Sequence, residues 1–212
     1  MVKKKDVPQH IVDAAMELAA ERGWRRLSLA EIAARAQLPL GEVIERFSSK
    51  AGILRAFLDG LDRAVVAGDV DLSQPVRDRL FEVVMRRLEA MSPHKAAIRV
   101  VLREAGGDPL AALSGARRFP RSMALMLETS GLSSAGLRGV VRIEGLAAIY
   151  LNAVRVWLCD DSPDAAKTMA ALDRGLRRAE SLVAMVTRSR PAAVVQHERD
   201  THKPHGAGHN AG

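Results

Sequence analysis

Apolar residues recur at intervals of three and four along most of the chain, and this spacing restricts the fold more than any other feature. Over residues 8–22 the pattern comprises Ile11, Ala14, Ala15, Leu18 and Ala19, and Gly23 ends it. No segment shows the alternation typical of a half-buried strand. Aromatic residues make up only 3% of the 212 residues, so aliphatic side chains must fill the core, which suits helices better than sheets. The sequence predicts an all-α protein.

Turn and capping residues divide the predicted helices into two domains and a tail. Residues 1–67 contain four predicted helices, at about 8–22, 28–35, 40–46 and 50–66. Residues 72–190 form a larger helical domain, with helices ending at about 91 and 104, shorter pieces over 109–129, and long helices at about 134–159 and 163–189. Ser28 and Glu31 are expected to form a capping box at the start of the second helix. Ser162 is expected to cap the last helix, with Pro163 in its first turn. Residues 191–212 are polar and rich in Gly and Pro, which predicts disorder.

Three short helices with a turn of about four residues before the third are typical of a helix-turn-helix, whose last helix enters the major groove of DNA. The residues of this region are Ile11 to Trp24, Ser28-Leu29-Ala30-Glu31-Ile32-Ala33, Gly41, Phe47 and Ser49-Lys50. Over residues 11–57 they resemble the TetR family. The resemblance implies a TetR-like fold, in which a three-helix helix-turn-helix module precedes a larger C-terminal helical ligand-binding domain.

The predicted recognition helix departs from the TetR pattern in its charge. Such helices usually read Ser-Lys-Gly-Thr-Leu-Tyr-x-His-Phe, whereas this chain reads Pro-Leu-Gly-Glu-Val-Ile-Glu-Arg-Phe from Pro39. Phosphate contacts dominate the affinity for DNA, and two carboxylates on a short helix oppose them. We therefore interpret the module as retained but repurposed, with DNA binding as the alternative. Under that alternative the DNA-binding residues are Ser28, Leu40, Gly41, Glu42, Ile44, Glu45, Arg46 and Lys50.

The helix predicted at 134–159 is apolar over most of its circumference, which is typical of a helix buried between neighbours. Together with the Met-rich segment 122–127 it predicts an adaptable apolar chamber, while core packing is the simpler explanation for any single residue. Glu144 and Asn152 are the interior polar candidates, either for a ligand head group or for a bond to a neighbouring helix. The predicted lipid- or ligand-binding residues are Leu88, Leu102, Met123, Met126, Leu127, Val141, Glu144, Leu146, Ala148, Ile149, Asn152, Ala153, Val156 and Trp157.

A second resemblance lies in the C-terminal domain. Its residues are Leu146-Ala147-Ala148-Ile149-Tyr150, Asp161-Ser162-Pro163-Asp164, Thr168 and Leu172-Asp173-Arg174-x-Leu176. They resemble the ubiquinone (coenzyme Q) biosynthesis accessory proteins, and the similarity spans about residues 10–185. The resemblance implies binding of an isoprenoid lipid in the C-terminal domain and assistance to a diiron hydroxylase.

The chain departs from that second family at three places. Gly139-Val140 stands where the family has a surface Trp-Tyr pair, and Met169 stands where a Trp follows the Thr. Residues 191–212 have no apolar face like that of the membrane-docking helix of eukaryotic members. Lipid binding therefore carries over better than the hydroxylase partnership or stable membrane docking.

Charge, cysteine content and hydropathy bound the remaining possibilities. The net charge of +7 divides into +2 over residues 1–67 and +5 over residues 68–212, so basicity alone does not establish DNA binding. A single cysteine, Cys159, excludes a disulfide within the monomer and fits a reducing compartment. Charges interrupt every apolar stretch before the ~20 residues of a membrane span. These features predict a cytoplasmic protein, peripheral at the inner membrane if it serves a membrane enzyme.

The sequence predicts neither catalysis, nor a cofactor, nor a metal site. His10 and His94 stand alone, and the other four histidines lie in the tail with a spacing unlike that of a structural zinc site. A phosphate-binding glycine loop and a Gly-x-Ser-x-Gly elbow are both absent from the sequence. The chain is therefore expected to be a non-enzyme.

Two hypotheses remain. The first is a TetR-fold lipid-binding accessory protein of ubiquinone biosynthesis that presents an isoprenoid quinone precursor to a hydroxylase, with transient membrane contact. The alternative is a TetR-family DNA-binding transcriptional repressor released by a small apolar ligand. Under both, the long C-terminal helices are predicted to form a homodimer interface.

Overall fold

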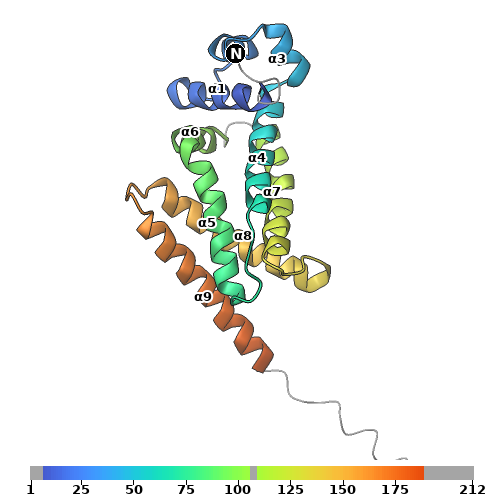
Figure 1. The fold of residues 1–212 in the computed structure, drawn as a ribbon, viewed down its shortest axis with the longest axis vertical. Helices are drawn as coiled ribbons and strands as arrows, with labels where there is room; N and C mark the ends of the chain where they lie inside the picture. Colours follow the sequence, from blue (N-terminus) through green and yellow to red (C-terminus); the bar gives the residue numbers. More distant parts are fainter. Residues whose placement is uncertain (1–6, 106–108, 189–212) are drawn as a thin grey trace, which may run out of the picture.

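The computed structural model describes residues 7–105 and 109–188, and the regular structure in these two ranges is entirely helical, as predicted. The helices are α1 (Val7–Arg22), α2 (Leu29–Arg35), α3 (Leu40–Arg46), α4 (Lys50–Ala67), α5 (Val76–Met91), the 3₁₀ helix η1 (Ser92–His94), α6 (Lys95–Ala105), α7 (Pro109–Thr129), α8 (Gly136–Leu158) and α9 (Ala166–Arg188). The first three helices lie at one end of an elongated molecule, and α4 leads from them into a larger bundle (Figure 1). Within the described ranges, no helix combines the length and the apolarity required to cross a bilayer.

Local capping sets the geometry of the N-terminal helices. The predicted capping box at α2 is confirmed: Ser28 Oγ accepts the Glu31 N–H at 3.2 Å, and the Glu31 carboxylate accepts the Ser28 N–H at 2.8 Å. After α2, Gln37 adopts a φ of 54°, and the Leu38 N–H donates to the Ala33 carbonyl at 3.0 Å. This closed turn leads through Pro39 directly into α3, so the order of helix, turn and helix follows the prediction.

Helix α4 connects the N-terminal helices with the bundle. Its buried side chains recur every four residues, at Ile53, Phe57, Leu61 and Val65, and it packs against α1, α5 and α7. Because of this, one continuous apolar core runs from α1 to α9. The division into residues 1–67 and 72–190 stays a prediction, and the predicted tail 191–212 lies outside the described residues.

Two helix boundaries differ from the prediction. Residues 109–129 form one helix and not shorter pieces, although Pro120 lies inside it. Pro120 is exposed, so the backbone bond that its missing N–H costs falls on the solvent side of the helix. The last helix begins at Ala166 and not at residue 163, because Ala165 adopts a φ of 52°.

The turn between α8 and α9 is organised by Asp160. Its Oδ1 accepts the Ser162 N–H at 3.2 Å and the Ser162 hydroxyl at 2.5 Å. Its Oδ2 accepts the Thr168 N–H at 2.8 Å and the Thr168 hydroxyl at 2.7 Å. These bonds, led by the one from the Ser162 hydroxyl, hold the pKa of Asp160 well below its ordinary value. Ser162 and Thr168, two residues of the Asp161-Ser162-Pro163-Asp164…Thr168 pattern, therefore have a local structural role.

Candidate nucleic-acid interface and ligand-binding bundle

Helix α3 presents most of its surface to solvent. Only Val43 is fully buried, while Leu40 and Ile44 are 42% and 49% exposed. Gly41, Glu45 and Arg46 are also exposed, and Glu42 is half-buried. One anchoring side chain thus leaves a face that combines apolar, acidic and basic groups, of the kind that can contact thymine methyls, cytosine amino groups and phosphates.

Two predicted DNA-binding residues shape the loop before α2. Lys50 Nζ donates to the carbonyls of Trp24 and Arg25, at 3.0 and 3.1 Å. Ser28 is occupied by the capping box. Both residues thereby order the segment that exposes Arg25 and Arg26. The predicted residues of α3 occupy every position of the helix except Val43, and their contact with DNA stays a prediction.

Helix α6 and the 3₁₀ helix before it fasten the N-terminal helices to the bundle. Glu104 Oε2 accepts the Arg25 N–H at 2.9 Å. His94 Nε2 lies 3.4 Å from Asp13 Oδ1, and its ring meets the edge of Phe57 at a centroid distance of 5.4 Å. The loop before α2 is therefore bonded directly to α6, and η1 contacts α1 and α4.

A buried polar cluster joins four helices inside the bundle. Arg87 on α5 donates from Nη1 to Asp62 on α4 at 2.5 Å and from Nε to the Tyr150 hydroxyl on α8 at 3.2 Å. Ser122 on α7 donates to both Asp62 oxygens, at 2.9 and 3.1 Å. Burial raises the pKa of Tyr150, so its hydroxyl stays protonated and donates to Met91 Sδ at 3.3 Å. This cluster was not predicted from the sequence. The signal that could have indicated it is Arg87, which interrupts the apolar stripe on α5.

The predicted ligand-binding residues lie in three different environments. The buried ones are Leu88, Met123, Met126, Leu127, Leu146, Ala153 and Trp157. The half-buried ones are Ile149 and Val156, and the exposed ones are Leu102, Val141, Glu144, Ala148 and Asn152. The expectation that Glu144 and Asn152 point into the interior is wrong, because both lie on the face of α8 turned away from the core. Ligand contact by any residue of the set stays a prediction.

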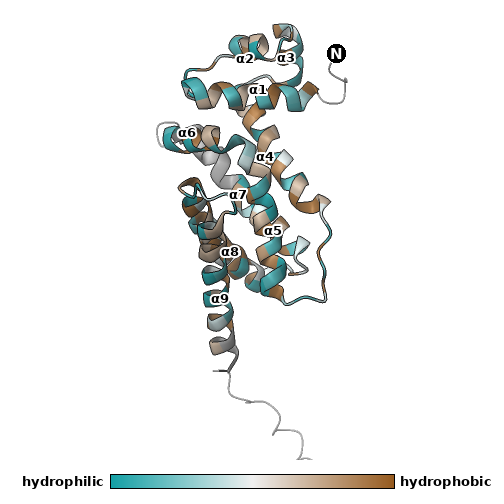
Figure 2. Ribbon diagram, turned by 60° about the vertical axis from the view of Figure 1, so that its left-hand side comes forward, coloured by the Kyte–Doolittle hydropathy of each residue, from teal (hydrophilic) through white to brown (hydrophobic). Residues whose placement is uncertain are grey.

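Helix α8 is apolar on its inner face, and its outer face carries large apolar side chains beside the polar Glu144, Asn152 and Arg155. Leu137 is 82% exposed, and Val140, Val141 and Leu151 are each more than half exposed. Gly145 and Ala148 lie on the same side, and a Cβ added at Gly145 would meet no other atom within 4 Å. Figure 2 shows the apolar character of this helix as brown ribbon beside α9. The sequence pattern predicted that α8 is buried on all sides, whereas in the single chain the other helices cover only its inner face.

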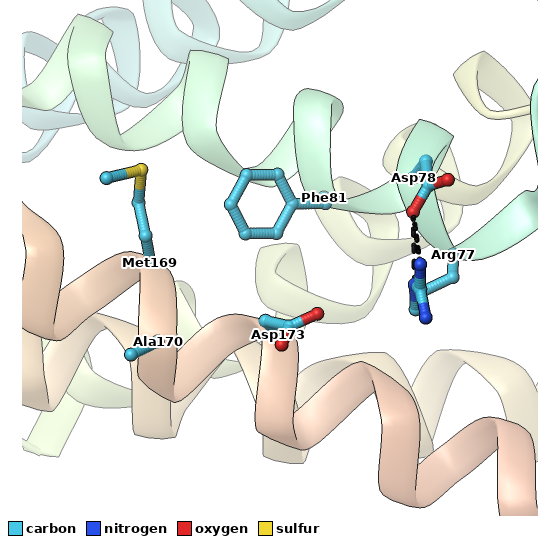
Figure 3. Close-up of a pocket in the computed structure, with 6 residues that line it drawn as sticks. All are labelled: Arg77, Asp78, Phe81, Met169, Ala170 and Asp173. Atoms are coloured by element: carbon cyan, nitrogen blue, oxygen red, sulfur yellow. Dashed lines mark hydrogen bonds and ion pairs between the residues drawn. The ribbon is translucent and has the colours of Figure 1, made fainter.

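The described residues also form grooves on the bundle surface. Between α5 and α9, a groove of about 370 Å³ contains Phe81 and Met169, with Asp173 and the Arg77–Asp78 ion pair, 3.0 Å long, at one end (Figure 3). Between α4 and α7, a second groove of about 820 Å³ is lined mainly by charged side chains. None of the predicted ligand-binding residues lines either groove.

Comparison with known proteins decides the fold. Residues 11–57 match the family described as bacterial regulatory proteins, tetR family. A TetR transcriptional regulator from Nitrosomonas europaea superimposes with a TM-score of 0.70 at 24% identity, over 82% of this chain and 98% of that one. The chain has a TetR-like fold. No curated protein sequence matches it significantly.

Further structures extend the TetR-like fold beyond the first helices, over 83% and 88% of the chain. A TetR transcriptional regulator from Rhodococcus sp. RHA1 gives a TM-score of 0.59 at 18% identity, over 83% of this chain and 97% of that one. A tetR-family transcriptional regulator from Streptomyces coelicolor gives 0.59 at 18% identity, over 88% and 89%. The predicted fold class is confirmed, with a TetR-family N-terminal domain in front of a helical bundle.

Proposed function

We propose that the protein is a DNA-binding transcriptional regulator whose affinity for DNA is controlled by a ligand of the helical bundle. The observation that carries the proposal is the exposed face of α3, held by Val43 alone within a domain that matches the tetR regulatory proteins. A helix that contributes one side chain to the core has its remaining surface available for a partner. The similar structures reported above are named transcriptional regulators, which supports the same choice.

The face of α3 suits base recognition better than phosphate binding. Leu40 and Ile44 offer apolar contact to thymine methyls, and Glu45 can accept from the amino group of cytosine. Phosphate contacts then fall to the exposed arginines Arg25, Arg26 and Arg46. This division meets the objection that α3 is too acidic, since Arg46 lies at the end of α3 and the loop before α2 adds Arg25 and Arg26.

We further propose that the working form is a homodimer joined through the outer face of α8. A soluble monomer rarely leaves so many large apolar side chains of one helix exposed, and a two-fold axis lets one such face cover its copy. The small residues Gly145 and Ala148 permit close approach. Dimerisation places two α3 helices on one duplex, which is how helix-turn-helix proteins read paired half-sites.

The ubiquinone accessory role is the weaker candidate. Two residues of the motif that suggests it, Ser162 and Thr168, are accounted for by their bonds to Asp160, whereas the Leu172-Asp173-Arg174 part is not. An isoprenoid ligand, a hydroxylase partner and membrane contact all depend on that resemblance. Lipid extraction and mass spectrometry of protein from a quinone-producing host separates the candidates, because co-purified isoprenoid lipid would reverse this ranking.

Selection from random duplexes, followed by titration at several salt concentrations, tests the regulator. We expect one enriched sequence and a steep loss of affinity with salt. Glu45→Gln should change the preferred base with about a 10- to 100-fold shift in discrimination. Arg46→Gln should weaken all sequences equally and reduce the salt slope by about 1. Lys167→Gln, on an exposed position of α9, is the control. Absence of any enriched sequence overturns the proposal.

A further inference from the structure

Side-chain pairs fix how α4 and α7 are aligned along the groove between them. Neither family resemblance assigns a ligand to this groove. Asp59 on α4 pairs with Arg118 on α7, and Asp62 accepts from Ser122. From the first pair to the second, the residue numbers increase on both helices, from Asp59 to Asp62 and from Arg118 to Ser122. The two helices therefore run side by side in the same direction (Figure 1). One turn further along each helix, Arg63 and Arg121 therefore stand at neighbouring levels on the groove walls.

Three acids and three arginines line this groove, but two of the arginines are not paired with any of the acids. Each acid already has a partner: Asp59 has Arg118, Asp62 has Arg87 and Ser122, and Glu128 accepts the Ser134 N–H at 2.6 Å. Arg63 and Arg121 are exposed and have no carboxylate partner within the described ranges. Guanidinium groups in such positions favour a bidentate anionic ligand, above all a carboxylate or phosphate.

Beyond the arginines the groove wall is apolar for about one helical turn, as far as Glu128 on α7. Val66 and Ala67 follow Arg63 on α4, and Ala124 and Leu125 follow Arg121 on α7. Val66 is 55% exposed although it is a large aliphatic residue. These four side chains cover about one helical turn, roughly 6 Å along the groove. On both helices, the arginine therefore precedes the apolar side chains in the direction of the chain.

We propose that this groove binds an amphipathic carboxylate, with the head group on Arg63 and Arg121 and a short alkyl chain along Val66 and Leu125. The volume of about 820 Å³ is within the range of small-molecule sites. A bound anion also competes with Asp59 for Arg118. Because α4 begins directly after α3, loosening the Asp59–Arg118 pair changes how α3 is held, and this last step rests on the proposed function.

Calorimetric titration of the full chain with octanoate tests the groove. Octanoate should bind at least about tenfold more tightly than octylamine or acetate, which lack the anion and the chain respectively. Arg63→Gln and Arg121→Gln should each weaken octanoate about tenfold. Arg103→Gln, exposed on α6 outside the groove, should leave the affinity unchanged. Circular dichroism establishes that each variant is folded, as expected for substitutions at exposed positions.

Three results would overturn the assignment: no octanoate binding, equal binding of octylamine, or unchanged affinity in both groove variants. The regulatory step is measured separately, as release of the selected duplex by octanoate in the wild type but not in Arg121→Gln. Octanoate binding without release supports the groove and refutes its effector role. Failure to bind any duplex refutes the proposed function, while the calorimetric result still decides the groove.

Discussion

Replacing Arg87 by Met removes the cation that neutralises Asp62 inside the bundle. The two side chains are 5% and 18% exposed, and their atoms approach to 2.5 Å. Without Arg87, the Ser122 hydroxyl is the partner that Asp62 retains among residues 7–105 and 109–188. Breaking a buried ion pair from one side costs about 3–5 kcal/mol, and we expect about 3 kcal/mol here because Asp62 is partly solvated. The ion pair that is lost belongs to the polar cluster that joins α4 to α5, α7 and α8.

A double-mutant cycle isolates the pair itself. Urea unfolding of Arg87→Met, Asp62→Asn and the double variant, at one fixed protein concentration, should give a coupling of about 2 kcal/mol. The exposed pair Arg35–Glu21 is the matched control, since its atoms lie 2.6 Å apart but its side chains are 30% and 50% exposed. Its coupling should be much smaller, because solvent screens exposed charges. Equal couplings in both cycles, or a cost below about 1 kcal/mol for Arg87→Met, would refute the role of burial.

Three further predictions concern the α8–α9 turn and the outer face of α8. Because the pKa of Asp160 is lowered in the folded state, the stabilisation that its carboxylate provides is complete above the ordinary value of 3.8 and is lost as the pH falls below it. The difference in the free energy of unfolding between wild type and Asp160→Asn should therefore shrink in acid. A difference that is independent of pH contradicts this prediction. Thr168→Val should lower the free energy of unfolding by about 1–3 kcal/mol in chemical denaturation, since the buried Thr168 hydroxyl donates to Asp160; a neutral effect shows that the hydroxyl is dispensable. Leu151→Glu should shift dimer to monomer in analytical ultracentrifugation, whereas Leu102→Glu, similarly exposed at 51% against 56%, should not; equal behaviour of both variants argues against an interface on α8.

Local patterns predicted the helices of this chain because each boundary depends on neighbouring residues. The box of Ser28 and Glu31 starts α2 as expected, and the spacing of aliphatic residues places α3 correctly. Long-range contacts were not accessible in the same way. The partnership of Arg87 with Asp62 and Tyr150 joins residues 25 and 63 positions apart, and periodicity carries no information on such pairs. For the same reason, α8 was predicted to be covered on all sides, although covering its outer face requires a second copy or a ligand.

The Asp160 turn illustrates why a motif can indicate a fold without indicating an activity. Ser162 and Thr168 are fixed by the need to satisfy one buried carboxylate and the first N–H groups of α9. Any chain with this turn needs the same residue types, whatever its bundle binds. Residues such as Arg63 and Arg121 are different, because nothing in the folding of α4 or α7 requires two arginines on one groove. Positions that the fold leaves unexplained are therefore the better guide to the ligand of this protein.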